Sequence, residues 1–219
     1  MFNFVPVLLQ VGVMKLNEKK IQILLTAEKL FADNGFDGTT IRQISKKAGI
    51  NIAMISYYFG SKKKLLEALL IYRISDFGSE FDSIVSDKGT YLEKIDAFIE
   101  MMVKRIHQNR RTHKIVSFEY SNPFREINFE VYENYKKENF NIVANFVKNG
   151  QEQGEFSKNI NVQMIIPTIL GTYFHFYYNK NFYQNLLDIS NESEIEHYVH
   201  NQLTQHIKQT IKALLTYEE

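Results

Sequence analysis

Apolar side chains recur every three or four residues along most of the chain, and this spacing restricts the fold more than any other feature of the sequence. The last segment shows the pattern most clearly, with a single stripe of Ile195, Val199, Leu203, Ile207, Ile211 and Leu214. Such spacing is typical of amphipathic helices, whereas the alternating pattern of a half-buried strand is scarce. The sequence therefore predicts an all-α protein of about nine helices, with no internal repeat.

Capping residues mark where several of these helices begin. Three segments fit the capping box, in which Ser or Thr precedes Glu or Gln by three residues: Thr40 to Gln43, Thr90 to Glu93 and Ser193 to Glu196. Asn17, Asn51 and Ser61 are further candidate N-caps, and Gly35 is a candidate C-cap. The predicted helices cover 18–34, 41–48, 52–59, 62–77, 90–107, 114–120, a long segment from the Asn122–Pro123 pair to Gly150 or Gly154, 162–178, and 193–214.

Residues 2–13 (FNFVPVLLQVGV) carry no charged side chain. They are too few to span a bilayer as a helix, which needs ~20 apolar residues, and they lack the basic start and the cleavage site of a secretory signal. We interpret residues 1–14 as an apolar extension upstream of a natural start at Met14, or as a flexible arm. The absence of cysteine excludes disulfides and Cys-ligated metals, and we expect a cytoplasmic protein.

The net charge of +1 conceals a polarised chain. Residues 15–66 contain ten basic and four acidic residues, a balance of +6, whereas the remainder contains 16 basic and 21 acidic residues, a balance of −5. Such asymmetry indicates a nucleic-acid-binding module, although solvated helix faces would also produce it.

The two short helices predicted between Thr40 and Phe59 flank Gly49, which is the pattern of a helix-turn-helix. The second helix is short enough to enter a major groove ~12 Å wide. Packing between the two helices would use Ile44, Ala48, Ile50 and Ile55. The outer face would then carry Asn51, Ile52, Ala53, Met54, Ser56, Tyr57 and Tyr58. Apolar side chains there can contact thymine methyl groups, and tyrosine hydroxyls can reach phosphates.

Lys62, Lys63 and Lys64 lie in the first turn of the next predicted helix. The helix dipole disfavours a cation at that end by about 0.3–1 kcal/mol, and a neighbouring phosphate would reverse the sign. The alternative interpretation is a solvated charge cluster.

Residues 19–70 resemble the N-terminal DNA-binding domain of the TetR family of bacterial transcriptional regulators. The resemblance covers about a quarter of the chain. It rests on Ala27, Leu30, Phe31, Gly35, Phe36, Thr39, Thr40, Ile44, Ala48, Gly49, Ile50, Ile55, Tyr58, Phe59, Ser61, Lys62 and Leu65. It implies a helix-turn-helix domain over residues 15–62 and a ligand-binding and dimerisation domain over residues 63–219.

The resemblance also implies roles for single residues. Thr40 and Arg42 would contact the DNA backbone and a base edge, and Tyr58 and Lys62 would hold phosphates. The groove-reading positions would be Asn51, Ile52, Ala53, Met54 and Tyr57. Ser56 departs from the common pattern of the family, which has a phosphate-contacting tyrosine at this position.

The last two predicted helices are candidates for a four-helix dimer interface. Gly171 would allow close approach of helices, and the stripe of Val199, Leu203, Ile207 and Ile211 would face the partner. The alternative is that both helices belong to the core of one chain. A two-fold dimer would read two half-sites ~34–36 Å apart, or a multiple of that distance.

The helices in the middle of the chain are rich in aromatic residues, some of which could line an apolar pocket. The candidates are His107, Phe118, Phe124, Tyr132, Tyr135 and His175, although aromatic stripes also occur in ordinary cores. We therefore expect a homodimeric repressor of a palindromic DNA operator, released by a small apolar or amphipathic effector. The alternative is a regulator of the same kind that has no such effector and is controlled by a protein partner.

A helical metal-dependent enzyme is the remaining alternative. His197 and His200 lie three residues apart, with Glu194, Glu196 and His206 nearby. However, the sequence contains no H-E-x-x-H, G-x-S-x-G, P-loop or G-x-G-x-x-G motif. We therefore expect no enzymatic activity, no cofactor and no metal.

Overall fold

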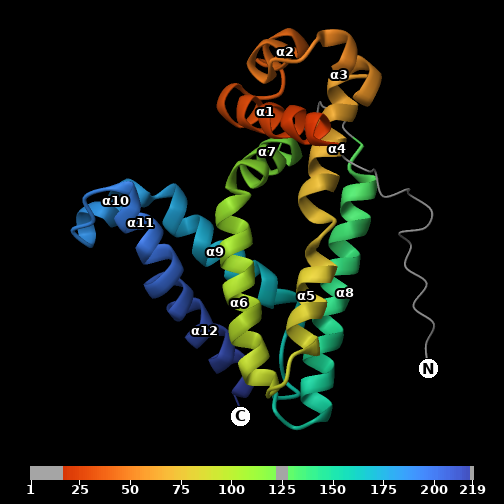
Figure 1. Cartoon of the computed structure of the whole chain (residues 1–219). Helices are drawn as coiled ribbons and strands as arrows, with labels where there is room; N and C mark the ends of the chain where they lie inside the picture. Colours follow the sequence, from red (N-terminus) through yellow and green to blue (C-terminus); the bar gives the residue numbers. More distant parts are fainter. Residues whose placement is uncertain (1–16, 122–127, 218–219) are drawn as a thin grey trace, which may run out of the picture. The chain divides into compact units, whose positions relative to one another are not determined.

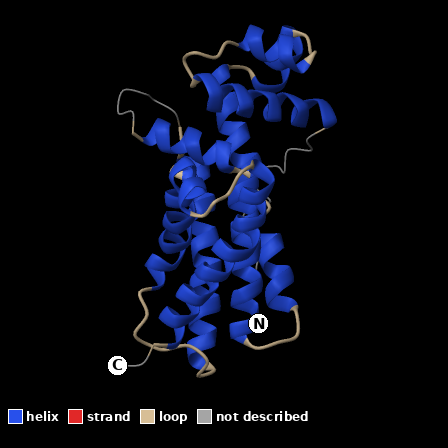
Figure 2. Ribbon diagram, turned by 90° about the vertical axis from the view of Figure 1, so that its left-hand side faces the viewer, coloured by secondary structure: helices blue, strands red, loops and turns tan. Residues whose placement is uncertain are grey.

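The computed structural model describes residues 17–121 and 128–217, and all regular elements in these ranges are helical (Figures 1 and 2). They are α1 (Glu18–Asn34), α2 (Ile41–Ala48), α3 (Ile52–Phe59), α4 (Lys62–Ile74), α5 (Phe77–Ser86), α6 (Tyr91–Gln108), α7 (Arg110–Tyr120), α8 (Glu130–Glu152), α9 (Ile165–Tyr178), α10 (Lys180–Leu186), α11 (Glu192–Tyr198) and α12 (Thr204–Thr216). A 3₁₀ turn (Val162–Met164) precedes α9, and a π-helical segment (Val199–Leu203) joins α11 to α12. The predicted all-α fold is confirmed.

The described residues form two compact units, which we call the N-terminal and the C-terminal unit. The N-terminal unit comprises residues 17–70, 114–121 and 128, and the C-terminal unit comprises residues 71–113 and 129–217. The boundary therefore differs from the one predicted after residue 62. Leu65, Leu66 and Leu69 of α4 are fully buried, and Lys114 Nζ of α7 donates a hydrogen bond of 2.8 Å to Ala32 O. Residues 1–14, the predicted extension, lie outside the described ranges.

The helix starts agree closely with the sequence. The capping boxes of Thr40 and Thr90 are complete in both directions. Asn17 Oδ1 accepts a hydrogen bond from Lys20 N at 2.9 Å. At α11 the cap is Asn191 instead of the predicted Ser193, because Glu194 N donates to Asn191 Oδ1 at 3.0 Å.

Three features differ from the predicted helices. The helix expected to continue past residue 74 ends at Ile74, and α5 follows it as a separate helix. Helix α10 was not predicted, and its seven residues bury no side chain completely. The C-terminal helix contains the π-helical segment, where Thr204 Oγ1 donates to Val199 O at 2.7 Å. The predicted helix start at residues 122–123 lies outside the described ranges.

The core of the C-terminal unit forms where α6, α9 and α12 pack against one another, and where α5 packs against α6 and α8 (Figure 1). Phe81 makes edge-to-face contacts with Phe98 and Phe146, at ring-centre distances of 5.2 and 5.6 Å. Tyr173 is fully buried within the same core. Each of these three phenylalanine side chains stabilises the fold by about 1.5–3 kcal/mol through removal of apolar surface from water. Among the described helices, none is long and apolar enough to cross a membrane.

Candidate nucleic-acid interface

The turn between α2 and α3 is held by several hydrogen bonds. Gly49 adopts the left-handed conformation (φ 64°, ψ 28°), in which a residue with a Cβ atom is strained. Ser45 Oγ donates to Ile50 O at 2.6 Å, and Gln22 Nε2 of α1 donates to Ala48 O at 2.9 Å. These bonds fix α3 against α2 within the N-terminal unit.

Helix α3 has one buried face and one exposed face. Ile55 and Phe59 are 1% and 6% exposed and pack inward. The exposed face carries the side chains that the sequence placed there: Asn51, Ile52, Ala53, Ser56 and Tyr57, with Met54 and Tyr58 half-buried beside them. No side chain of α3 is charged. The exposed face of the helix therefore carries methyl groups, one amide and several hydroxyls.

The two adjacent tyrosines of α3 differ in their surroundings. The side chain of Tyr57 is 85% exposed. The Tyr58 hydroxyl accepts a hydrogen bond of 3.4 Å from Asn17 Nδ2, and Lys20 Nζ lies 5.3 Å from the centre of its ring. Asn17 and Lys20 thus hold Tyr58 beside the start of α1.

Lys62 fastens the loop between α1 and α2. Its Nζ donates to Phe36 O and to Thr39 O, both at 2.9 Å, and lies 4.3 Å from the centre of the Phe36 ring. The buried Thr39 Oγ1 lies 3.0 Å from Leu30 O. An ammonium group has three N–H donors, so one remains for a phosphate. Sequence reasoning missed this bracing role, because the partners lie 23 and 26 residues away.

Other cationic side chains near α3 in sequence extend into solvent. Lys63 and Lys64 are exposed at the start of α4. Thr40 and Arg42 are exposed at the start of α2, and Lys46 and Lys47 are exposed at its end. The N-terminal unit thus combines an uncharged helix, α3, with basic residues on the two helices that flank it in the chain, α2 and α4.

The five described residues of the predicted pocket differ in their surroundings, and the pocket stays a prediction. His107 is 3% exposed and bonded on both ring nitrogens, whereas His175 is exposed. Phe118 is 57% exposed and belongs to the N-terminal unit. Tyr132 and Tyr135 are half-buried on α8, and Phe124 lies outside the described residues. Three hollows on the surface of the C-terminal unit are lined by other, mostly polar residues.

The predicted dimer stripe needs correction. Val199, Leu203, Ile207 and Ile211 are at most 6% exposed and lie in the core of their own chain, where the C-terminal helix packs on α6 and α9. Helical spacing identifies an apolar face but does not say which chain covers it. Gly171 is exposed on α9, and a Cβ atom there would meet nothing within 4 Å.

The C-terminal unit also contains a polar cluster that the sequence did not reveal as a set. One ring nitrogen each of His107 and His200 and one carboxylate oxygen of Glu196 all lie within 4.8 Å of one another. His107 Nδ1 lies 2.7 Å from the Tyr173 hydroxyl, and His107 Nε2 lies 2.9 Å from Glu196 Oε1. The hydrogen bond from His107 lowers the pKa of Glu196, and burial lowers the pKa of His200. Burial also raises the pKa of Tyr173, so its hydroxyl stays protonated.

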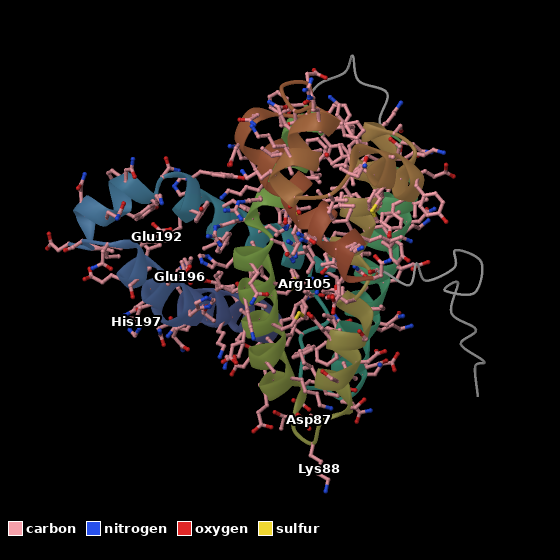
Figure 3. The ribbon with its side chains drawn as sticks, turned by 45° about the horizontal axis from the view of Figure 1, so that its top comes forward. Asp87, Lys88, Arg105, Glu192, Glu196 and His197 are labelled. Atoms are coloured by element: carbon pink, nitrogen blue, oxygen red, sulfur yellow. The ribbon has the colours of Figure 1, made fainter. Side chains whose placement is uncertain are left out.

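Three other polar residues considered as metal ligands from the sequence, Glu194, His197 and His206, lie outside this cluster. Glu194 accepts hydrogen bonds from Ser190 N and Asn191 Nδ2 at the start of α11. His197, labelled beside Glu196 in Figure 3, is exposed and its ring Nδ1 lies 3.3 Å from Asn201 Nδ2. His206 is exposed on α12.

Known proteins resemble the chain over both units. Residues 23–69 match the family described as "Bacterial regulatory proteins, tetR family", and residues 92–211 match the "Tetracyclin repressor-like, C-terminal domain". The probable HTH-type transcriptional regulator YttP of Bacillus subtilis is 28% identical over 145 residues, which are 63% of this chain and 67% of that protein. The fatty acid metabolism regulator protein of Bacillus subtilis is 24% identical over 157 residues, 70% of this chain and 79% of that protein.

Solved structures share the fold. The crystal structure of the transcriptional regulator FadR from Bacillus subtilis in complex with stearoyl-CoA superposes with a TM-score of 0.69 at 19% identity. The superposition covers 91% of this chain and 99% of that one.

Proposed function

We infer the function from the family: the chain belongs to the TetR family of bacterial regulatory proteins and is a DNA-binding transcriptional regulator. We propose that it represses genes by binding a palindromic operator as a homodimer. We also propose that a small apolar or amphipathic effector releases it from the operator. The observation that carries the proposal is the exposed, uncharged face of α3, fixed on α2 and followed by the lysines of α4. Such a protein would act where the bacterial chromosome lies, in the cytoplasm.

In the proposed complex α3 lies in the major groove. Asn51, Ile52, Ala53, Met54 and Tyr57 would face base edges there. Thr40 and Arg42 would contact the DNA backbone and a base edge, and Tyr58 and the third donor of Lys62 would hold phosphates. Ser56 would lie among them with a hydroxyl in place of the family's tyrosine. Thymine would be the preferred base opposite Ala53 and Met54, because its C5 methyl group offers an apolar contact.

The proposed dimer uses the outer face of α9, since the inner faces of the C-terminal helices are covered. Met164, Gly171 and Tyr178 are exposed and lie at intervals of seven residues, close to two helical turns. Met164 ends the 3₁₀ turn just before α9, and Gly171 and Tyr178 lie at the middle and the end of α9, so the three define one stripe. Gly171 lets a second copy of α9 approach closely at the centre of this stripe.

The effector would act through α4, which begins with Lys62 in the N-terminal unit and ends in the C-terminal unit. The carbonyl oxygen of Arg73, in its last turn, accepts a hydrogen bond of 2.8 Å from Arg105 Nη2 of α6. The Arg105 guanidinium also pairs with Asp76 and Glu80 (Figure 3 labels Arg105). A shift of α6 on effector binding would pull on the end of α4, and coupling of about 1–3 kcal/mol would lower operator affinity 5–150-fold.

Selection of bound sequences from random double-stranded DNA tests the DNA-binding half of the proposal. We expect an enriched palindrome whose half-sites lie ~34–36 Å apart, or a multiple of that distance. Ala53→Asp is the matched negative variant, because it places a carboxylate on the exposed face of α3 without touching its packing. If the wild type and Ala53→Asp enrich the same DNA sequences equally, the proposal that α3 contacts the bases is wrong.

Titration of the operator complex with acyl-CoA thioesters and free fatty acids tests the effector half. The FadR relative was crystallised with stearoyl-CoA, which makes these the first compounds to examine. We expect operator affinity to fall as the acyl chain lengthens, because apolar burial rises with each CH₂ group. If none of these amphipathic compounds changes the affinity, control by a protein partner replaces the effector, and DNA binding stands.

A further inference from the structure

The cluster of His107, Glu196 and His200 has no part in the proposed DNA contacts or dimer face. We propose that these three side chains bind a divalent transition-metal ion, for which Zn²⁺ is the probe. The site would join the last turn of α6 to α11 and the π-helical segment, across 89 residues of sequence between His107 and Glu196.

One ligand atom from each of the three side chains lies within 4.8 Å of the other two, so a zinc ion would need them to move closer together. A tetrahedral zinc ion at about 2.0–2.2 Å from each ligand needs ligand atoms about 3.3–3.6 Å apart. His107 Nε2 lies 2.9 Å from one carboxylate oxygen of Glu196, Oε1, and His200 Nε2 lies 3.8 Å from the other, Oε2, so the two histidines approach opposite oxygens of the same carboxylate. Small rotations of the Glu196 and His200 side chains, which are 45% and 40% exposed, would bring all three atoms into range.

The chemistry of the ligands selects the class of metal. Two imidazoles and one carboxylate suit zinc and its neighbours in the first transition row, whereas magnesium and calcium prefer oxygen ligands alone. Metal binding requires a deprotonated carboxylate and neutral imidazoles.

Tyr173 supplies the outer support that metal-binding histidines usually have. Its hydroxyl lies 2.7 Å from His107 Nδ1 and is fully buried. Once Nε2 binds the ion, its lone pair is used for the metal and the proton of the neutral ring lies on Nδ1, from which the phenol oxygen can accept a hydrogen bond. The ring of His107 is thus already oriented before a metal arrives.

Because two of the three proposed ligands are partly exposed, a bound ion would exchange with solvent. The exposed edges of Glu196 and His200 leave an entry path to the buried His107 Nε2. Three protein ligands also leave the fourth zinc position open for water. Arg110, whose guanidinium donates a hydrogen bond to His107 O, adds a nearby positive charge that weakens the site.

Zinc titration of the full chain without an affinity tag, in competition with a chromophoric chelator, tests the proposal. We expect one Zn²⁺ per chain, with affinity reduced at least about tenfold in His200→Ala and in Glu196→Ala. Tyr173→Phe keeps the buried ring and should weaken binding roughly 10–100-fold by removing the outer support. His197→Ala is the matched control, because His197 is exposed on the same helix and outside the cluster.

The visible absorption of bound Co²⁺ provides a second readout of the ligand set. A four-coordinate nitrogen and oxygen site gives strong bands, which His200→Ala should abolish and His197→Ala should retain. Equal zinc affinity in the wild type and His200→Ala, with both helical by circular dichroism, would overturn the proposal. So would an equal loss in His197→Ala, which would indicate scattered surface histidines. The titration contains no DNA, so its failure would leave the proposed repressor function untouched.

Discussion

Lys62 combines a bracing role in the structure with a proposed contact to DNA. Its position in the first turn of α4 predicts a phosphate contact. In the structure its ammonium also bridges two carbonyl groups of the loop between α1 and α2. The residue that would touch DNA therefore also orders the loop that leads into the helix-turn-helix.

Lys62→Ala should consequently change both stability and DNA binding. Loss of two charge-assisted hydrogen bonds should lower the free energy of unfolding by about 2–4 kcal/mol. Loss of one phosphate contact should weaken all operator sequences and reduce the salt slope by about one. Urea unfolding and binding across a range of salt concentrations measure the two effects.

Lys63→Ala is the control for stability, because Lys63 is exposed and should leave the unfolding midpoint unchanged. An unchanged salt slope in Lys62→Ala, measured at a temperature where the variant is folded, would restrict Lys62 to the bracing role.

His113 makes the stability of the C-terminal unit depend on pH. It packs on Phe174 with a ring-centre distance of 4.9 Å. Burial, with Lys136 and Arg105 nearby, lowers its pKa from 6.5 to about 4. Between these values the unfolded chain binds a proton at this histidine and the folded chain does not, so stability falls as the pH falls from about 6.5 towards about 4.

At pH 5 the expected loss from His113 is about 2 kcal/mol, from 1.36 kcal/mol per pH unit. His113→Leu should remove this part of the pH dependence, whereas the exposed His206→Leu should retain it. Urea unfolding at pH 7.5 and pH 5 provides the comparison. A wild-type pH dependence that persists in His113→Leu would show that other groups cause it.

At the scale of elements, the short helices were predictable because their signals are local. A cap and its partner lie three residues apart, and the boundaries of α2 and α3 follow directly from Thr40, Gly49 and Asn51. Helix α10 has no such cap, since Asn179 makes no side-chain capping bond, and it was not predicted. The end of α4 at Ile74 also lacks a Gly or Pro signal in the sequence.

The uncharged face of α3 leads to a prediction about the operator. Replacing thymine by uracil at the half-site positions opposite Ala53 and Met54 removes a methyl group and no hydrogen bond. Each replacement should cost about 0.8 kcal/mol, or about fourfold in affinity. Competition binding with uracil placed inside or outside the half-sites measures this effect. Equal affinity for all these operators would show that α3 does not read methyl groups.

At the scale of the whole molecule, we propose that the exposed face of α9 forms the dimer interface. Gly171→Arg places a long charged side chain at the centre of the stripe defined by Met164, Gly171 and Tyr178. We expect a monomer by sedimentation analysis and a large loss of operator affinity, because one unit then binds one half-site. The change fits the monomer, since a Cβ atom at Gly171 meets nothing within 4 Å.

Ser83→Arg on the exposed side of α5 is the matched control and should remain a dimer. A dimeric Gly171→Arg with normal operator affinity would move the interface to another surface. If Gly171→Arg stays dimeric but no longer binds DNA, the substitution has disturbed the fold of the chain and not the dimer interface.

The sequence by itself determined the helical class, the caps, the helix-turn-helix and the basic N-terminal quarter, because these depend on neighbours within a few residues. Only the tertiary structure decided which apolar faces one chain covers. Val199, Leu203, Ile207 and Ile211 have the same spacing whether a partner or α6 lies against them. Contacts between distant segments, such as His107 with Glu196 or Lys62 with Phe36, likewise leave no periodic signal, since they depend on how helices pack.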